Sequence, residues 1–77
     1  MKIQVFAALK DYFEKEFVVT QNLENVAALK SYLIGKNQKA EKLVDLCRFA
    51  VGNEFVDLNF SLNANDTISI IPPSSGG

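Results

Sequence analysis

The residues with the most unusual chemistry stand at the end of the sequence, in the run Pro72-Pro73-Ser74-Ser75-Gly76-Gly77. Gly76 and Gly77 have no β-carbon, so they can thread a narrow channel and leave the last carbonyl open to an attacking atom. A carboxylate is inert at neutral pH, so its use requires activation by a partner, for example as a mixed anhydride with AMP. We therefore predict that a partner protein activates the Gly77 carboxylate. The alternative is that the terminus has no function.

The two prolines determine how this segment leaves the fold. Pro72 and Pro73 lack a backbone N–H donor and hold φ near about −65°, so a preceding strand cannot continue through them. The serines and glycines that follow bury little apolar area, which predicts a flexible, solvated arm. Four residues after Pro73 reach about 13–14 Å, enough to enter a pocket on another protein. We expect a folded domain over residues 1–71 and a flexible tail over residues 72–77.

Composition limits the remaining possibilities. The chain has 77 residues, 48% of them hydrophobic, and a net charge of −1, which predicts one small folded domain. Its 9 acidic and 8 basic residues are interspersed, which argues against a nucleic-acid surface. No apolar run approaches the ~20 residues of a membrane span, and no signal-peptide pattern follows Met1. We therefore expect a cytoplasmic protein with no membrane or nucleic-acid partner.

The domain itself offers no other reactive group. There is no histidine, no Gly-rich phosphate loop and no set of side chains with metal-ligand spacing, so we expect no metal and no bound cofactor. Cys47 is the only cysteine, and because it follows Leu43 at helical spacing we expect it to pack as a small apolar residue. Isolated carboxylates are expected to be ordinary surface groups: Glu14, Glu16 and Asp66.

Alternating and helical apolar patterns predict an α+β fold. Strands are expected over residues 2–6, 16–20, 48–51, 54–56 and 67–71. Helical spacing predicts a short segment around Leu9, a helix that is capped by Asn25 and stopped by Gly35, and a second helix from Ala40 to Cys47. This order predicts a β-grasp with a mixed sheet of four to five strands and packed helices. Its first and last strands pair in parallel, since the middle helices supply the required crossover.

Strand alternation also predicts an outward-facing apolar patch. Ile3, Val5, Ile68 and Ile70 are expected to face the core, which turns Phe6 and Ile71 away from it. Phe55 lies on a neighbouring short strand. An exposed apolar patch on a small domain usually marks a partner interface, and the alternative is ordinary packing under a loop.

The final run from Ile68 to Gly77 resembles the end of the small subunit of molybdopterin synthase: an apolar strand, Pro-Pro, two residues and Gly-Gly. Three further segments match that family, namely Val5-Phe6-Ala7-Ala8-Leu9-Lys10, Asn25-Val26 with Leu29, and Phe49-Ala50-Val51-Gly52-Asn53. The Pro-Pro pair separates this group from the thiamine-pathway carriers. Two turns depart from the family pattern, at Gly52 and at Ala64-Asn65-Asp66, and put their local geometry in doubt.

The resemblance implies a ubiquitin-like sulfur carrier. Gly77, preceded by Gly76, would be adenylated with ATP by a ubiquitin-activating-type enzyme. It would then become a thiocarboxylate with sulfur from a sulfurtransferase or cysteine desulfurase. The tail would enter the active site of the synthase large subunit in a heterotetramer and pass sulfur to cyclic pyranopterin monophosphate. The catalytic residues would then belong to the large subunit, and this chain would be a sulfur donor.

The residues expected to contact a partner are Phe6, Lys10, Phe55, Ile71, Pro72, Pro73, Ser74 and Ser75, and among them Lys10 matches a basic position of the family that the sequence resembles. Three other functions stay open. The first is a sulfur carrier for thiamine or another thiolated product. The others are a ubiquitin-like protein modifier joined through Gly77 and a plain β-grasp binding module.

Overall fold

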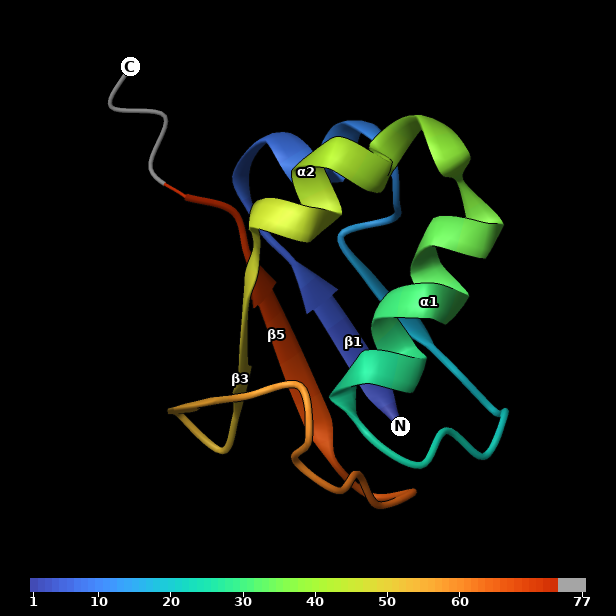
Figure 1. Cartoon of the computed structure of the whole chain (residues 1–77), viewed down its shortest axis with the longest axis vertical. Coiled ribbons are helices and arrows are strands. Elements are labelled where there is room, and N and C mark those ends of the chain that lie inside the picture. Colours follow the sequence, from blue (N-terminus) through green and yellow to red (C-terminus); the bar gives the residue numbers. More distant parts are fainter. Residues whose placement is uncertain (74–77) are drawn as a thin grey trace.

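The computed structural model describes residues 1–73 and contains the expected mixture of strands and helices (Figure 1). In chain order the elements are β1 (Lys2–Val5), the 3-10 helix η1 (Ala7–Asp11), β2 (Glu16–Val18), α1 (Val26–Lys36), the 3-10 helix η2 (Gln38–Ala40), α2 (Glu41–Leu46), β3 (Arg48–Val51), β4 (Glu54–Val56) and β5 (Thr67–Ile71). The predicted element order is therefore confirmed.

The strands form one five-stranded sheet in the order β2-β1-β5-β3-β4. β1 and β5 are parallel, whereas the other neighbouring pairs are antiparallel. The connection between the parallel strands contains α1 and α2, as parallel pairing requires. This confirms the predicted ubiquitin-like β-grasp. Because β1 and β5 run in the same direction, they end at the same edge of the sheet, where the chain leaves toward its C-terminus (Figure 1).

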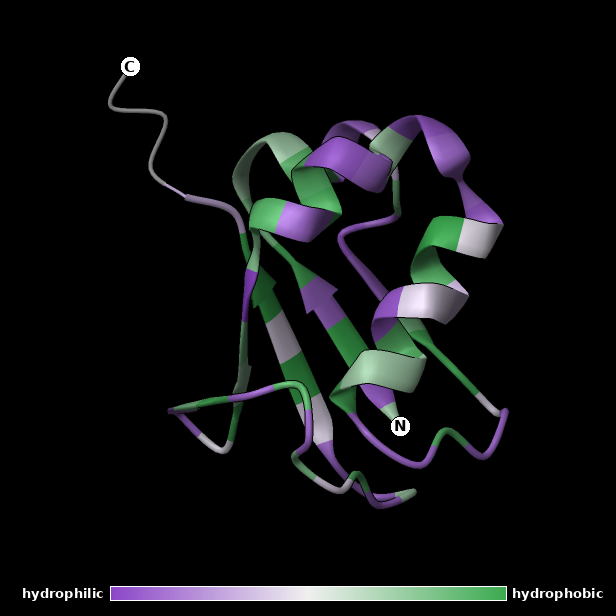
Figure 2. Cartoon of the chain, viewed as in Figure 1, coloured by the Kyte–Doolittle hydropathy of each residue, from purple (hydrophilic) through white to green (hydrophobic). Residues whose placement is uncertain are grey.

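The core lies between one face of the sheet and the helices. Along β1 and β5, apolar residues alternate with polar ones, as the bands in Figure 2 show. The apolar set is completely or almost completely buried, and α1 and α2 contribute buried side chains from the other side. These are Ile3, Val5, Ile68 and Ile70 from the two strands and Leu29, Leu33 and Val44 from the helices. The predicted core face of both strands is confirmed.

Helix α1 begins as predicted but ends later. The Asn25 side chain caps it by accepting a hydrogen bond from the Ala28 N–H at 2.9 Å. The helix then continues through Gly35 to Lys36, so the prediction that Gly35 stops it is wrong. The chain turns instead at Asn37, whose side chain accepts from the Lys39 N–H and caps η2. A glycine ends a helix only where it adopts a left-handed conformation, and Gly35 is not among the residues with positive φ.

Two predicted strands are shorter than expected, because the chain turns or leaves the ladder early. β1 ends at Val5, since the backbone reverses at Ala7, which has a φ of 53°. β2 ends at Val18 rather than at residue 20. The turn at Ala7 starts η1 and leaves Phe6 on the surface with 43% of its area exposed.

Replacing Ala7 with glycine should stabilise the domain. A left-handed φ costs an L-residue roughly 1–2 kcal/mol, and glycine avoids that cost but loses more entropy on folding. We expect Ala7→Gly to raise the free energy of unfolding by about 0.5–1 kcal/mol in urea titrations. The matched control is Ala8→Gly, where φ is not positive and the same change should destabilise the domain. Equal effects of the two variants would contradict this account.

Candidate functional site

The sheet surface opposite the helices brings together residues from three strands. In the antiparallel register, Arg48 of β3 lies opposite Ile71 of β5, and Ala50 lies opposite Phe55 of β4. Directly opposed residues share a face, so these side chains lie together on the side away from the core. Phe6 follows β1 at the edge where β5 also ends. We call Phe6, Arg48, Phe55 and Ile71 the tail-end patch.

The tail-end patch contains three of the residues predicted to contact a partner. Phe6 and Phe55 are 43% and 54% exposed, and Ile71 is half-buried. Lys10, a fourth, is exposed on η1, which begins at the edge where β1 and β5 end (Figure 1). Large aromatic side chains exposed at one edge of a small domain are typical of a protein contact surface.

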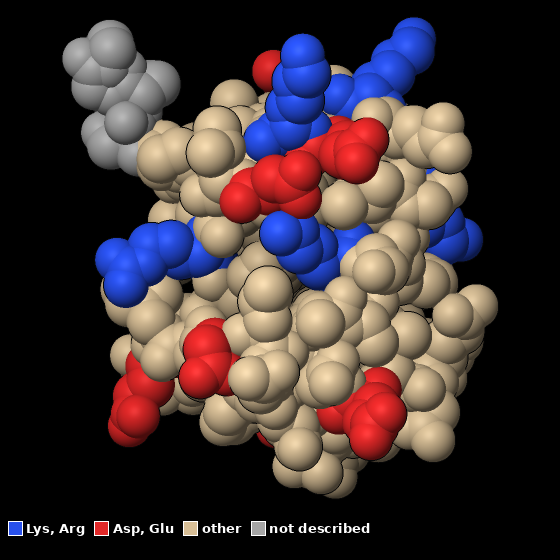
Figure 3. Space-filling model, viewed as in Figure 1, with Lys and Arg blue, Asp and Glu red and all other residues tan. Residues whose placement is uncertain are grey.

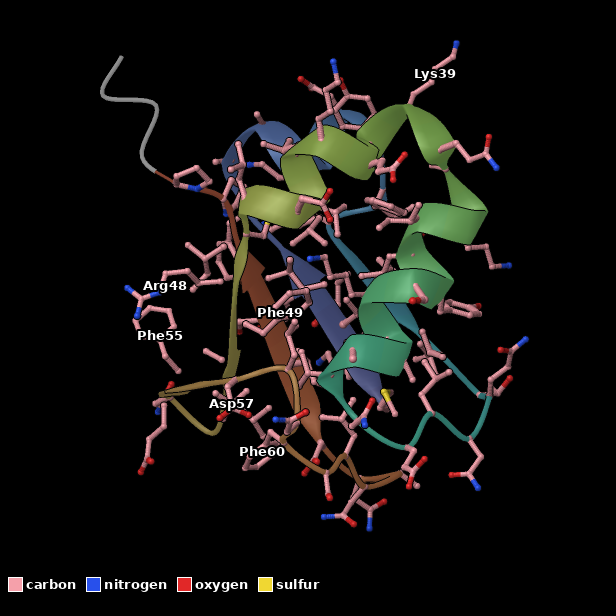
Figure 4. All side chains as sticks on the ribbon, in the orientation of Figure 1. Lys39, Arg48, Phe49, Phe55, Asp57 and Phe60 are labelled. Atoms are coloured by element: carbon pink, nitrogen blue, oxygen red, sulfur yellow. The ribbon has the colours of Figure 1, made fainter. Side chains whose placement is uncertain are left out.

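The sequence interpretation missed Arg48. Its guanidinium carbon lies 3.9 Å from the centroid of the Phe55 ring, a cation–π contact. Figure 4 shows the two side chains next to each other outside β3, whereas Phe49 points toward the helices. Strand alternation already separated Arg48 from the buried Phe49. Its position beside Phe55 follows from the pairing of β3 with β4 and β5.

A tight turn holds Phe55 in this place. Gly52 and Asn53 both have positive φ, 59° and 70°, and they join the opposed residues Val51 and Glu54. A two-residue hairpin with positive φ at both central positions is a type I′ turn, which glycine and asparagine favour. The departure from the family pattern at Gly52 therefore forms a regular hairpin that presents Phe55 on the outer face.

A second group of side chains on the outer face is polar, and its members bond to one another. Lys2 Nζ lies 2.8 Å from a Glu16 carboxylate oxygen, and the Gln4 side-chain amide donates to the same oxygen at 3.2 Å. The hydrogen bond from Lys2 is the largest cause, and the one from Gln4 the next, that lower the pKa of the Glu16 carboxyl group. The Ser69 hydroxyl donates to the Gln4 carbonyl oxygen at 3.4 Å. These polar side chains thus bond to one another, and Gln4 and Glu16 also line the hollow beside Phe6, so they border the tail-end patch.

Shallow hollows border the tail-end patch on two sides. One of about 430 Å³ lies beside Arg48 and Phe55, and one of about 220 Å³ lies beside Phe6 and Lys15. Both are open to solvent. Their shape suits side chains of a docked protein better than an enclosed small molecule, because ligand sites bury most of their ligand.

Cys47 has the environment of a structural thiol. It is half-buried against the core, and its S–H donates to the Leu43 carbonyl at 3.2 Å. Burial raises its pKa to about 11, so the thiol is protonated at neutral pH and is a poor nucleophile. This agrees with the expectation that Cys47 packs as a small apolar residue.

Residues 1–73 hold no other obvious reaction centre. Within them, no three side chains among His, Cys, Asp and Glu are placed to hold a metal ion. No helix of this part is long and apolar enough to cross a membrane. Acidic and basic side chains alternate over the helical side of the molecule in Figure 3, without a surface of one sign.

The end of β5 sets the start of the predicted arm. The strand ends at Ile71, Pro72 is buried, and Pro73 is exposed. The domain therefore covers Pro72, and Pro73 is the first exposed residue after β5. Four of the predicted site residues lie outside the described residues: Ser74, Ser75, Gly76 and Gly77.

Solved structures with similar folds cover almost the whole chain. Small archaeal modifier protein 1 (SAMP1) from Haloferax volcanii has a TM-score of 0.79 at 21% identity, covering 99% of this chain and 97% of that one. A Pyrococcus furiosus protein assigned as molybdopterin converting factor subunit 1 has a TM-score of 0.80 at 19% identity, with 95% of each chain covered. These two likenesses support the fold alone.

A third structure adds a complex. It is the complex of subunits 1 and 2 of the molybdopterin-converting factor from Helicobacter pylori 26695. The matched chain has a TM-score of 0.72 at 25% identity, covering 99% of this chain and 96% of that one. The ThiS family model matches residues 3–77. This match shows that the chain belongs to the ThiS family of ubiquitin-like sulfur carriers.

Proposed function

We propose that this protein is the sulfur-carrying small subunit of a molybdopterin synthase. The observation that carries the proposal is its similarity, over 99% of its length, to a chain from the complex of molybdopterin-converting factor subunits of Helicobacter pylori. The Pro72-Pro73 pair before Gly76-Gly77 supports the same assignment over a thiamine-pathway carrier. The tail-end patch supports it too, since it offers a protein contact surface at the edge where the tail begins.

The proposed chemistry is confined to Gly77. A ubiquitin-activating-type enzyme joins its carboxylate to AMP, using ATP and releasing pyrophosphate. The outer sulfur of a protein persulfide, formed by a sulfurtransferase or cysteine desulfurase, then displaces AMP and gives an acyl disulfide. A second thiol reduces this disulfide, which releases the donor and leaves a thiocarboxylate on Gly77. The proposal places these steps in the cytoplasm and assigns no bound cofactor to this chain.

The large subunit then receives the tail. Ser74 and Ser75 give reach, Gly76 passes the narrow entrance, and the thiocarboxylate sulfur attacks cyclic pyranopterin monophosphate. Water then hydrolyses the thioester that joins Gly77 to the pterin, so the sulfur stays on the pterin and a carboxylate that can be charged again returns to Gly77. Two deliveries build a dithiolene, and the catalytic side chains belong to the large subunit of the heterotetramer.

Intact mass tests the carrier function directly. The protein is co-expressed with a ubiquitin-activating-type enzyme and a cysteine desulfurase, and its mass should rise by the difference between one sulfur and one oxygen atom. The same mixture with a known carrier is the positive control. If the known carrier is charged and this chain is not, the proposal fails.

The tail-end patch should be needed for docking. Phe6→Asp and Ile71→Asp each place a charge in an apolar contact, and we expect affinity for the large subunit from the same genome to fall by about tenfold or more. Isothermal titration calorimetry measures the affinity. The matched control is Val18→Asp, because Val18 is 69% exposed on the same sheet face but opposite Lys2, at the other end of β1 from Phe6. Unchanged affinity of both patch variants would exclude this face.

A second candidate function is a ubiquitin-like protein modifier. It is favoured by the fold similarity to small archaeal modifier protein 1 of Haloferax volcanii. In that case Gly77 would form an isopeptide bond with a lysine of another protein. Tagged protein expressed with the activating enzyme would then appear in higher-mass conjugates that resist reducing agents, whereas a carrier alone would not form them.

A further inference from the structure

Arg48 is a cation without an ionic partner inside the described part of the chain. Residues 1–73 contain two ion pairs, Lys2 with Glu16 and Lys30 with Asp45. Asp57 lines the same hollow as Arg48 but forms no ion pair with it, and its carboxylate accepts from the Asn59 N–H at 2.9 Å. Among residues 1–73 the guanidinium therefore has no carboxylate within ion-pair distance.

Arg48 is the charged member of the tail-end patch, and the charged residues around the patch are of both signs. Glu54 is next to Phe55 in sequence, but strand alternation places it on the opposite face of β4. Glu16 lies on the outer face beside Phe6, where both line one hollow, and its carboxylate is already paired with Lys2 at 2.8 Å. Exposed Lys10 lies at the same edge and is followed by exposed Asp11 on η1. The charge that a docked partner meets between Phe55 and Ile71 is therefore that of Arg48 itself.

The contact with Phe55 prepares Arg48 for one kind of ligand. Its guanidinium carbon lies over the Phe55 ring, 3.9 Å from the ring centroid, which is within cation–π distance. The N–H donors of a guanidinium point outward in its plane, where they can bind both oxygens of a carboxylate. The contact with Phe55 also limits the rotamers of Arg48, which lowers the entropy lost when a partner binds.

We propose that the partner which covers the tail-end patch places an aspartate or glutamate side chain on Arg48, while apolar side chains cover Phe55 and Phe6. This inference rests on the proposed function, and it adds the chemistry of the partner surface. The occupant is a protein, the large subunit, with a carboxylate at the centre of an apolar contact. Large subunits with a basic residue at that point should be rejected by repulsion.

Charge reversal at Arg48 tests the proposal. We expect Arg48→Glu to weaken binding to the large subunit from the same genome by about tenfold or more, and Arg48→Lys to weaken it less, since lysine keeps the charge but not the planar fork. Binding of the unchanged protein should also weaken as salt rises, and this dependence should shrink in Arg48→Glu. Calorimetry at two salt concentrations measures both effects.

The matched control is Lys36→Glu. Lys36 likewise lies over an aromatic ring, at 5.4 Å from the Tyr32 centroid, but it belongs to α1 on the helical side. The Lys36→Glu variant should leave both the affinity for the large subunit and the salt dependence of binding unchanged. Thermal unfolding of both variants shows whether either loses its fold. If Arg48→Glu does not fold, the affinity of an Arg48→Met variant is measured in its place. Replacing the partner's paired acid by arginine should restore binding to Arg48→Glu.

Two results would overturn the inference: unchanged affinity of Arg48→Glu or Arg48→Met, or equal losses in Arg48→Glu and Lys36→Glu. The proposed sulfur-carrier function would survive either result if Gly77 still acquires a thiocarboxylate and Phe6→Asp still weakens binding to the large subunit. If no thiocarboxylate forms and the large subunit does not bind the unchanged protein, the proposed function itself fails.

Discussion

Deleting Gly77 lowers sulfur transfer by at least about 10²-fold and leaves the domain folded. The shortened chain still ends in a carboxylate, but that of Gly76 stops about 3.3–3.6 Å short of the reaction centre. A displacement of even about 1 Å can cost 10²-fold in rate, because reacting atoms must meet at contact distance. The measurement is conversion of cyclic pyranopterin monophosphate by the reconstituted synthase, together with the mass of the carrier.

The control for this deletion is Ser74→Ala, which keeps the length of the tail and should transfer sulfur at nearly the normal rate. Thermal unfolding should give the same midpoint for both variants and the unchanged protein, because the sheet ends at Ile71. Normal transfer after the deletion would refute a role for Gly77. A lost fold would show that the domain depends on its terminal residues.

Replacing Ile70 with alanine removes a large fraction of the stability. Ile70 is completely buried in β5, between β1 and β3, and lies opposite Phe49. Truncating a buried isoleucine to alanine costs about 2–5 kcal/mol, because it loses apolar burial and leaves a cavity. A chain of 77 residues has roughly 4–12 kcal/mol in total. Urea titration followed by circular dichroism measures the change.

Ser69→Ala is the control for this prediction, since Ser69 is the neighbouring residue of β5 and lies on the outer face. Its hydroxyl makes one long hydrogen bond, 3.4 Å, to Gln4. We expect this variant to cost less than about 1 kcal/mol. An Ile70→Ala protein as stable as Ser69→Ala would show that β5 is not the centre of the core.

Most of the β-grasp could be predicted from local patterns. The alternation of Ile68 and Ile70 with polar residues, and of Ile3 and Val5 with Lys2 and Gln4, determines which face of each strand is buried. Asn25 marked the start of α1, because its side chain satisfies a free backbone donor. The end of α1 could not be predicted from Gly35, since a glycine ends a helix only if the chain turns there.

The sequence by itself determined the apolar faces of the strands, the cap of α1 and the Gly76-Gly77 chemistry that we propose for this sulfur carrier. These follow from side-chain period and residue type, which act over a few residues. Only the tertiary structure placed Arg48 opposite Ile71 and over Phe55, and buried Pro72. Such contacts depend on strand register between segments distant in sequence, and register is a property of the assembled sheet.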